Sequence, residues 1–329
     1  MDIVLTSLAF IVAALCAGTM GFAIQRGATC TVAAVGEVVS ERSFRRLVAL
    51  LEAALWVGGG LLVAQALHVL PKMPAGYAVS AWTIVGGVLL GFGAFVNRAC
   101  VFGAIANFGS GSWAYIFTPV GFYVGCISVG AVFSPPAAQK LSYGSPVLQA
   151  SAWVAVLFLA FVLLRVGRPL LAGARAGKLR ESVSAHAWAP HTATTVIGVT
   201  FLFMLLLVGS WAYTDVLVEL ARGMAGSLVA RSLLLVALLA GATLGGWTAG
   251  RFRHTPITGA QVLRCFIGGV LMGWGSLLIP GGNDGLILVG MPLLWPYAWL
   301  AFATMCLTIA AALLVRRASA ARPSERAAT

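Results

Sequence analysis

Long apolar runs separated by short polar connections dominate the pattern of residues along this chain. Charged side chains leave whole intervals empty, for example residues 3–25, 99–139 and 285–315. About 20 consecutive apolar residues are enough for a helix to cross the hydrocarbon core of a bilayer. We therefore predict nine membrane-spanning helices, at residues 3–24, 47–70, 77–96, 113–133, 149–166, 192–213, 228–250, 265–279 and 295–315.

Stretches rich in Gly, Pro or polar residues interrupt this pattern at 25–40, 97–112, 251–264 and 280–294. Irregular backbone at membrane depth is tolerated only where it is buried in protein or lines a cavity. We therefore predict re-entrant helix-loops in two pseudo-halves, about 1–166 and 192–317, joined by a linker at 167–191. The predicted fold is all-α, an inverted repeat forming one integral membrane domain over residues 1–317. A disordered basic tail is expected at 318–329.

A cysteine recurs at a fixed place in the interrupted stretches. Gly91-Phe92 repeats Gly21-Phe22, and Cys100 repeats Cys30 at the same spacing. A fainter copy of this pattern occurs in the second half, where Gly282 stands in place of the cysteine. A repeated broken helix with a thiol at a constant offset indicates a functional site.

Donor groups precede each of these thiols. Arg26 lies four residues before Cys30, and Asn97 and Arg98 lie just before Cys100. If each cysteine begins a short helix, its free N–H groups and partial positive charge suit an anion. These five residues are therefore candidate substrate contacts. Arg26 and Arg98 have an alternative interpretation, as ordinary basic anchors at the membrane surface.

The interrupted stretch at 280–294 adds Gly282 and Asn283 to the candidate binding residues. Asn283 and Asp284 either cap a short helix or contact a substrate. An ionised Asp284 facing the path would repel an anion, so we expect it to point away as a cap or turn residue.

Glu52 is a carboxylate inside an apolar run, which by default marks a functional candidate. Because Arg45 and Arg46 lie seven and six residues earlier, an interfacial ion pair with them is the alternative interpretation.

Composition and charge support an integral membrane protein. Only 9% of the residues are charged, against about 25% in soluble proteins. If the N-terminus is outside and the C-terminus inside, 17 of the 21 Lys and Arg residues lie on the inner side, as the positive-inside rule requires. The outer side then keeps Lys72, Lys140, Arg222 and Arg231. The net charge of +12 is spread over short loops, which disfavours nucleic acid as a partner. Without a C-x-x-C pair among the six cysteines, we expect neither a metal site nor a cofactor.

The motifs resemble those of the YeeE/YedE sulfur-transport family. The most telling stretch runs from Arg264 to Ile279, together with Asn97-Arg98-Ala99-Cys100-Val101-Phe102-Gly103. The resemblance implies an hourglass-like arrangement of nine spans, re-entrant helix-loops from both sides, and cysteines lining a narrow route for thiosulfate in a bacterial inner membrane. Cys30 and Cys100 match two of those cysteines. The family's third cysteine lies in a Gly-Cys-x-x-Gly pattern, where this chain has Gly281-Gly282-Asn283-Asp284-Gly285.

We therefore predict a permease, not an enzyme, that imports thiosulfate or a related small inorganic sulfur anion. Thiols bind such an ion weakly, which allows it to leave. Two alternatives remain open: uptake of another sulfur or selenium species, or a non-transporting sensor that serves a cytoplasmic regulator or sulfur-carrier protein. A sulfurtransferase is disfavoured because no acid–base partner accompanies Cys100.

Overall fold

The computed structural model describes residues 7–167, 186–223 and 228–321, and within these ranges every regular element is a helix. Eight of the described helices are long and apolar enough to cross a membrane. Large apolar side chains on their outer surfaces, such as Leu8 and Leu307, are exposed as lipid-facing residues should be. The protein is a multi-pass membrane protein, and the predicted all-α class is confirmed. The long helices are α1 (Leu8–Arg26), α3 (Arg45–Ala66), α4 (Ala81–Asn97), α6 (Phe117–Phe133), α10 (Pro190–Val208), α12 (Leu228–Thr248), α13 (Gly259–Leu278) and α15 (Pro296–Ala321).

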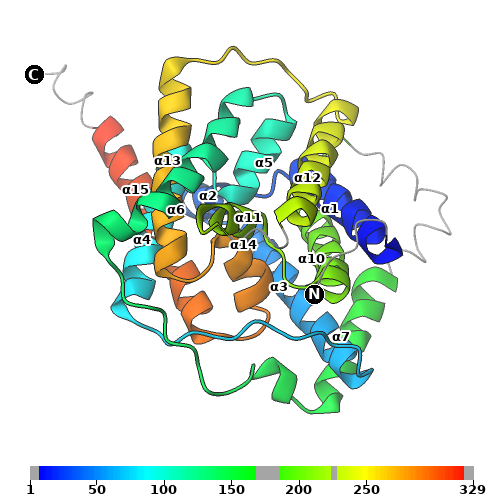
Figure 1. Ribbon diagram of the computed structural model, residues 1–329. Helices are drawn as coiled ribbons and strands as arrows, with labels where there is room; N and C mark the ends of the chain where they lie inside the picture. Colours follow the sequence, from blue (N-terminus) through cyan, green and yellow to red (C-terminus); the bar gives the residue numbers. More distant parts are fainter. Residues whose placement is uncertain (1–6, 168–185, 224–227, 322–329) are drawn as a thin grey trace, which may run out of the picture.

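Four short helices follow long ones after a break of a few residues. They lie near the middle of the view in Figure 1, with α12 and α13 on either side of them. We call them half-helices, since each is about half the length of a membrane span. They are α2 (Thr31–Glu41), α5 (Val101–Gly109), α11 (Tyr213–Ala221) and α14 (Asn283–Gly285), the last extended by the π-helical turn η4 (Leu286–Gly290).

The order long helix, half-helix, long helix occurs four times, twice in each half of the chain. Corresponding elements of the two halves are separated by a constant offset: Pro190 at the start of α10 is as far from Leu8 at the start of α1 as Tyr213 of α11 is from Thr31 of α2. The two half-helices of the second half are also spaced as those of the first. One internal repeat therefore sets the positions of all four half-helices.

One apolar helix stands outside this repeat. α7 (Ala152–Val162) continues into the π-helical turn η3 (Leu163–Gly167) and packs against α3. Only shorter 3-10 turns, η1 (Trp113–Ile116) and η2 (Val147–Gln149), complete the described elements. Among the described residues, α7 has no counterpart in the second half.

Several predicted boundaries were wrong. The predicted span 192–213 ends at Val208, because Gly209 with its positive φ stops the helix. The half-helix α11 follows. The stretch 251–264 is instead an open connection over 251–258 followed by the first turns of α13. The predicted tail was placed too early, because α15 continues to Ala321; residues 322–329 and most of the predicted linker, 168–185, lie outside the described residues.

Candidate functional site

Three of the four breaks are closed by the same backbone hydrogen bonds. Thr29 N donates to Ile24 O over 3.0 Å, Ala99 N to Ala94 O over 3.1 Å, and Gly281 N to Ser276 O over 2.9 Å. Each bond reaches back five residues, as in a Schellman cap, and turns the chain so that a new helix can begin. The residue that follows each of these donors is the N-cap of a half-helix: Cys30 for α2, Cys100 for α5 and Gly282 for α14.

Cys30 and Cys100 lie against each other. Their side chains interact directly. The Cys100 sulfur also accepts the backbone N–H of Thr31, the residue after Cys30, over 3.1 Å. In the other direction, a Cβ on Gly103 would lie 2.5 Å from the Cys30 sulfur, so only glycine leaves room for that thiol on the first turn of α5. The first half thus joins two thiols at two half-helix starts.

Asn283 brings α14 to this point. The Thr31 hydroxyl lies 3.5 Å from Asn283 Oδ1, and both residues are completely buried. The Nδ2 group of Asn283 has no hydrogen-bond partner among the described residues. A buried amide donor without a partner costs free energy unless a ligand accepts its hydrogen bond. Asn283 therefore has a free donor close to the two thiols.

Both carboxylate oxygens of Asp284 accept hydrogen bonds from α11. One carboxylate oxygen accepts the Thr214 backbone N–H over 3.0 Å, and the other accepts the Thr214 hydroxyl. Thr214 lies in the first turn of α11, where a carboxylate satisfies unpaired N–H groups and the helix dipole. Asp284 is a cap of the neighbouring half-helix, which is the kind of role expected from the sequence.

The structure gives Asn97 and Arg98 different surroundings from the thiols. Asn97 is buried, and its amide is used to hold the break: Nδ2 donates to Ala99 O over 2.8 Å, and Oδ1 accepts from Thr118 over 3.1 Å. Arg98 ends α4 in a left-handed conformation and is exposed, while Cys100, two residues later, is completely buried.

Arg26 is directed toward α12. Its guanidinium donates to the Thr248 hydroxyl over 2.8 Å and stacks on the ring of Phe22. The described contacts of the Arg26 side chain do not include Cys30 or Cys100, so the structure does not bring this predicted site residue to the thiols.

The suggested pairing of Glu52 with Arg45 or Arg46 was wrong. Glu52 accepts from Arg165 Nε over 2.9 Å and pairs with His191 Nδ1. These partners lie on η3 and α10, so Glu52 connects α7 and α10 to α3. Sequence distance hid this pairing, because the two partners lie 113 and 139 residues away along the chain.

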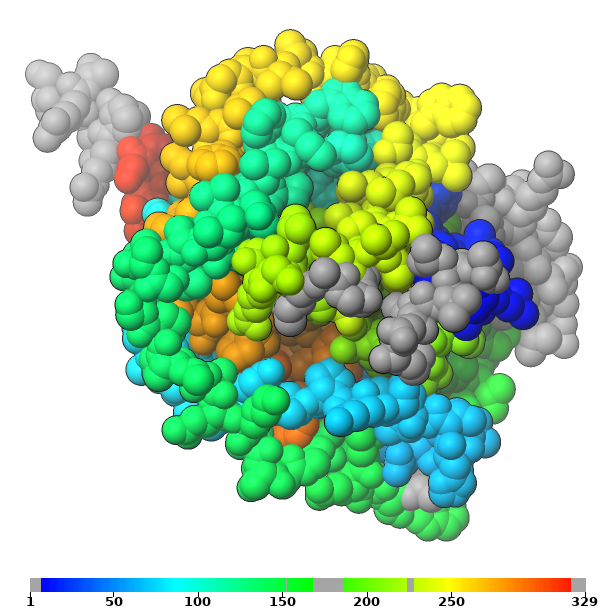
Figure 2. Space-filling model, viewed as in Figure 1, coloured from blue at the N-terminus to red at the C-terminus, as the bar shows by residue number. Residues whose placement is uncertain are grey.

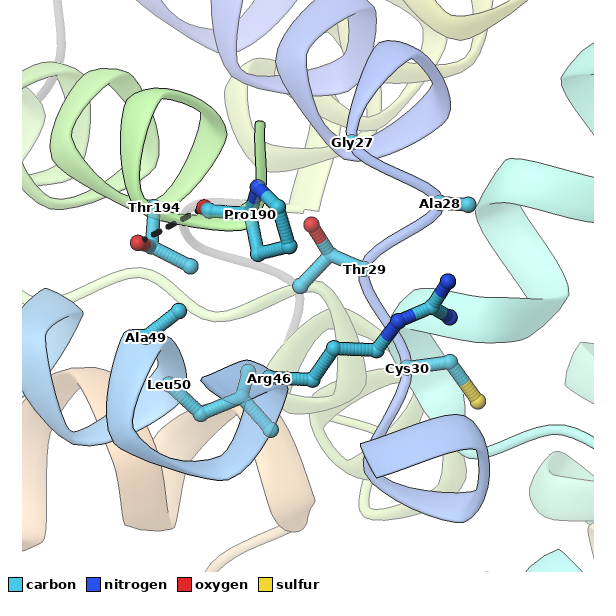
Figure 3. Close-up of a pocket in the computed structure, with 9 residues that line it drawn as sticks. All are labelled: Gly27, Ala28, Thr29, Cys30, Arg46, Ala49, Leu50, Pro190 and Thr194. Atoms are coloured by element: carbon cyan, nitrogen blue, oxygen red, sulfur yellow. Dashed lines mark hydrogen bonds between the residues drawn. The ribbon is translucent and has the colours of Figure 1, made fainter. Parts of the chain in front are cut away.

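A small cavity opens beside Cys30 (Figure 3). It is lined by the α1–α2 break, by the start of α3 and by Pro190 and Thr194 of α10, and its volume of about 10 Å³ is enough for one water molecule. Figure 3 shows the Arg46 guanidinium next to Ala28 and Cys30, and the Cys30 thiol on the side away from Ala49 and Leu50. Arg46 also pairs with Glu37 over 3.0 Å. We call this the Arg46 cavity.

A larger recess, of about 760 Å³, lies beside the start of α14. Pro280, the second residue before the N-cap Gly282, lines it together with Tyr77 and Tyr297. Among the described lining residues, Lys140 and Arg222 carry charge and none is acidic. Figure 2 shows a hollow on this face, between yellow-green α11 and the pale-blue residues near 77, with orange residues at its floor. We call this the Lys140 recess.

Sequence reasoning missed Ala212, the N-cap of α11, although the sequence held a signal for it. Ala212 is as far from Cys30 along the chain as Gly282 is from Cys100. The apolar residues before it hid the break at Gly209. Thr31, Gly103 and Arg46 were also not recognised as neighbours of the thiols, since only the folded chain brings the half-helices together.

A model of the sulphur transport family matches residues 26–311, which include all four half-helices. The chain belongs to the sulphur transport family. The resemblance to YeeE/YedE proteins is thereby confirmed, and the sulphur transport family supports a role in sulfur transport generally. A search of curated proteins found no match to the chain.

Proposed function

We propose that this protein imports thiosulfate, or a closely related small sulfur anion, across a bacterial inner membrane. The observation that carries the proposal is the meeting of Cys30 and Cys100 at the N-termini of two half-helices. Thiosulfate combines a dianionic charge, which helix N-termini favour, with a soft terminal sulfur that a thiol can contact. Sulfate has the same charge and no such sulfur, so the thiols give a physical basis for discrimination.

A chain of neighbouring groups supports a route through the molecule. The Lys140 recess reaches Pro280, and Asn283 follows at the start of α14. Asn283 lies against Thr31, Thr31 donates to Cys100, and Cys30 lines the Arg46 cavity. The basic residues of the recess would attract an anion, and the weak thiol contacts would let it pass on. Arg46 would receive the ion at the other end.

Transport can be tested with the purified full-length chain in proteoliposomes loaded with buffer and supplied with radiolabelled thiosulfate. We expect uptake above protein-free vesicles, competition by unlabelled thiosulfate, and much weaker competition by sulfate. Absence of uptake would contradict the transport proposal. Equal competition by sulfate would contradict a role for thiols in selectivity, and stronger competition by sulfite, sulfide or selenite would change the substrate.

The proposed orientation has the N-terminus outside and the C-terminus in the cytoplasm, with the Lys140 recess outside. It rests on the distribution of basic residues, 17 inside and 4 outside. A reporter fused after Thr329 should behave as cytoplasmic, and one inserted near Pro135 as extracytoplasmic. The opposite result would reverse the direction of the route.

A further inference from the structure

Cys30 and Cys100 contact each other from two different half-helices. Each sulfur lies against the backbone beside the other cysteine: Cys100 Sγ accepts the N–H of Thr31, and Cys30 Sγ lies over the Cα of Gly103. The thiol side chains interact directly, with no side chain between them at Gly103. A disulfide requires such proximity, with Cβ atoms about 3.5–4.5 Å apart.

The other cysteines differ in this respect. All six cysteines are among the described residues, and all are free thiols. The structure gives a direct thiol partner to Cys30 and Cys100, and to none of Cys16, Cys126, Cys265 and Cys306. Cys30 is also partly exposed and lines the Arg46 cavity, which places the pair at the end of the proposed route.

We propose that Cys30 and Cys100 form a dithiol that reacts with the sulfur–sulfur bond of inorganic polythionates and closes the path as a disulfide. Closure of a path rests on the proposed transport function, whereas the reaction of the dithiol does not. Polythionates such as tetrathionate are anions with an S–S bond between sulfonate-bearing sulfurs. The half-helix N-termini and Arg46 attract them for the same reason that they attract thiosulfate.

The reaction balances with tetrathionate as the oxidant. One thiolate attacks an inner sulfur of tetrathionate, breaks the central S–S bond and releases thiosulfate, leaving the second thiosulfate group on the cysteine. The other thiolate then attacks this cysteine sulfur, forms the Cys30–Cys100 disulfide and releases the second thiosulfate. Two thiols lose two protons and two electrons, and the central S–S bond of tetrathionate accepts the electrons.

This chemistry would make transport depend on the redox state of the sulfur compounds that reach the pair. The disulfide would join the starts of α2 and α5 and remove both thiols from the path. A reductant would restore the thiols and reopen it.

The test uses the full-length protein in proteoliposomes treated with tetrathionate. Peptide mass spectrometry without reduction should find a Cys30–Cys100 disulfide, and two thiosulfate ions should be released for each chain. Uptake of radiolabelled thiosulfate should fall to the level of protein-free vesicles and return after dithiothreitol. Cys16→Ala is the matched control, since it should form the same disulfide and release the same amount of thiosulfate.

The single variants separate the two chemical steps. Cys30→Ala and Cys100→Ala should each release at most one thiosulfate and keep a thiosulfate adduct on the remaining cysteine. The dithiol proposal is overturned if both cysteines remain thiols in the folded protein while the denatured chain oxidises, or if either pairs with another cysteine. Unchanged uptake by the oxidised protein would overturn closure. If the disulfide forms but untreated vesicles never take up thiosulfate, transport is contradicted and the dithiol chemistry stands.

Discussion

In the N-terminal half, the first turn of α2 donates a backbone N–H to the sulfur of Cys100, whereas in the C-terminal half the first turn of α11 donates one to the carboxylate of Asp284. The two bonds have nearly the same length, 3.1 and 3.0 Å, and both join the starts of two half-helices. The repeat has therefore kept the junction and changed the acceptor. A thiol is a weak acceptor, so a passing anion can displace it. A buried carboxylate that holds two hydrogen-bond partners is a strong acceptor and is not displaced in this way.

The same contrast holds at the four N-caps. Cys30 and Cys100 cap the half-helices of the first half, and Ala212 and Gly282 those of the second. All soft ligands at the half-helix starts therefore come from one half, and the second contributes the free amide of Asn283. Under the proposed function, the first half would contact the sulfur of the ion and the second would fix the shape of the site.

Loss of a first-half thiol should give the largest effect. We expect Cys100→Ala to reduce thiosulfate uptake to the level of protein-free vesicles, because the sulfur that contacts the ion and accepts from Thr31 is removed. The amount of protein in the membrane should not change. Cys126→Ala and Cys306→Ala serve as controls and should transport normally; equal losses in all three would mean that the thiols act only in packing.

A matched pair of glycines tests the contrast directly. Gly103 and Gly285 occupy corresponding positions of the two halves, but a Cβ on Gly103 meets the Cys30 sulfur at 2.5 Å, and one on Gly285 meets only Ala212 at 4.0 Å. Overpacking of this kind costs about 1–3 kcal/mol. If that cost falls on the transport step, Gly103→Ala should lower uptake roughly tenfold, since about 1.4 kcal/mol corresponds to a factor of ten.

Gly285→Ala should leave uptake close to that of the unmodified protein in the same proteoliposome assay. A similar loss in both variants would show that the two half-helices respond to added volume alone, and the proposed special position of the Cys30 thiol would be wrong.

Restoring a cysteine in the second half should not improve transport. A Cβ on Gly282 would lie 2.3 Å from the Thr214 hydroxyl, which Asp284 binds, so we expect Gly282→Cys to lower uptake several-fold. Gly282→Ala is the control for volume, and higher uptake by the cysteine variant than by the alanine variant would reveal a real role for a third thiol.

Asp284 should matter for stability more than for selectivity. Asp284→Ala leaves the buried N–H of Thr214 without its partner, which costs about 1–3 kcal/mol and should lower the Tm of the solubilised protein. Asp284→Asn keeps one acceptor oxygen and should lower the Tm less, with nearly normal uptake. A large loss of uptake in Asp284→Asn without a change in Tm would place this carboxylate in the path.

The smallest effect is expected at the Lys140 recess. Lys140→Gln removes one of the two positive charges that line it, so the KM for thiosulfate should rise a few-fold at low salt and less at high salt, where the field is screened. The kcat should not change. A KM that is unaffected at both salt concentrations would exclude Lys140 from attracting the ion.

The spans were predictable because a charge-free apolar interval has few structures available to it in a bilayer. The positions of Cys30 and Cys100 were predictable because each follows a Gly-Phe pair at the same spacing. The half-helix α11 was not predicted, since Gly209 alone marks the break before it within an apolar run. The open connection at 251–258 misled us because Pro256 and the flanking Gly250 and Gly259 resemble the residues of a true break. The fold instead holds this connection through Arg253, whose backbone N–H donates to Ser110 O over 3.0 Å. Contacts such as Glu52 with Arg165 depend on packing between distant helices.

In the proposed topology, α7 decides which way up the second half lies. Each repeat contains four long helices, and four crossings return a chain to the side from which it set out. Without a further crossing, α10 would start on the same side as α1, and the two halves would stand parallel. The apolar segment Trp153–Gly167 is shorter than the eight candidate spans, and as a ninth crossing it would turn the second half over. An odd number of crossings is thus what an inverted arrangement of two four-helix units requires, and one joining segment is enough to supply it.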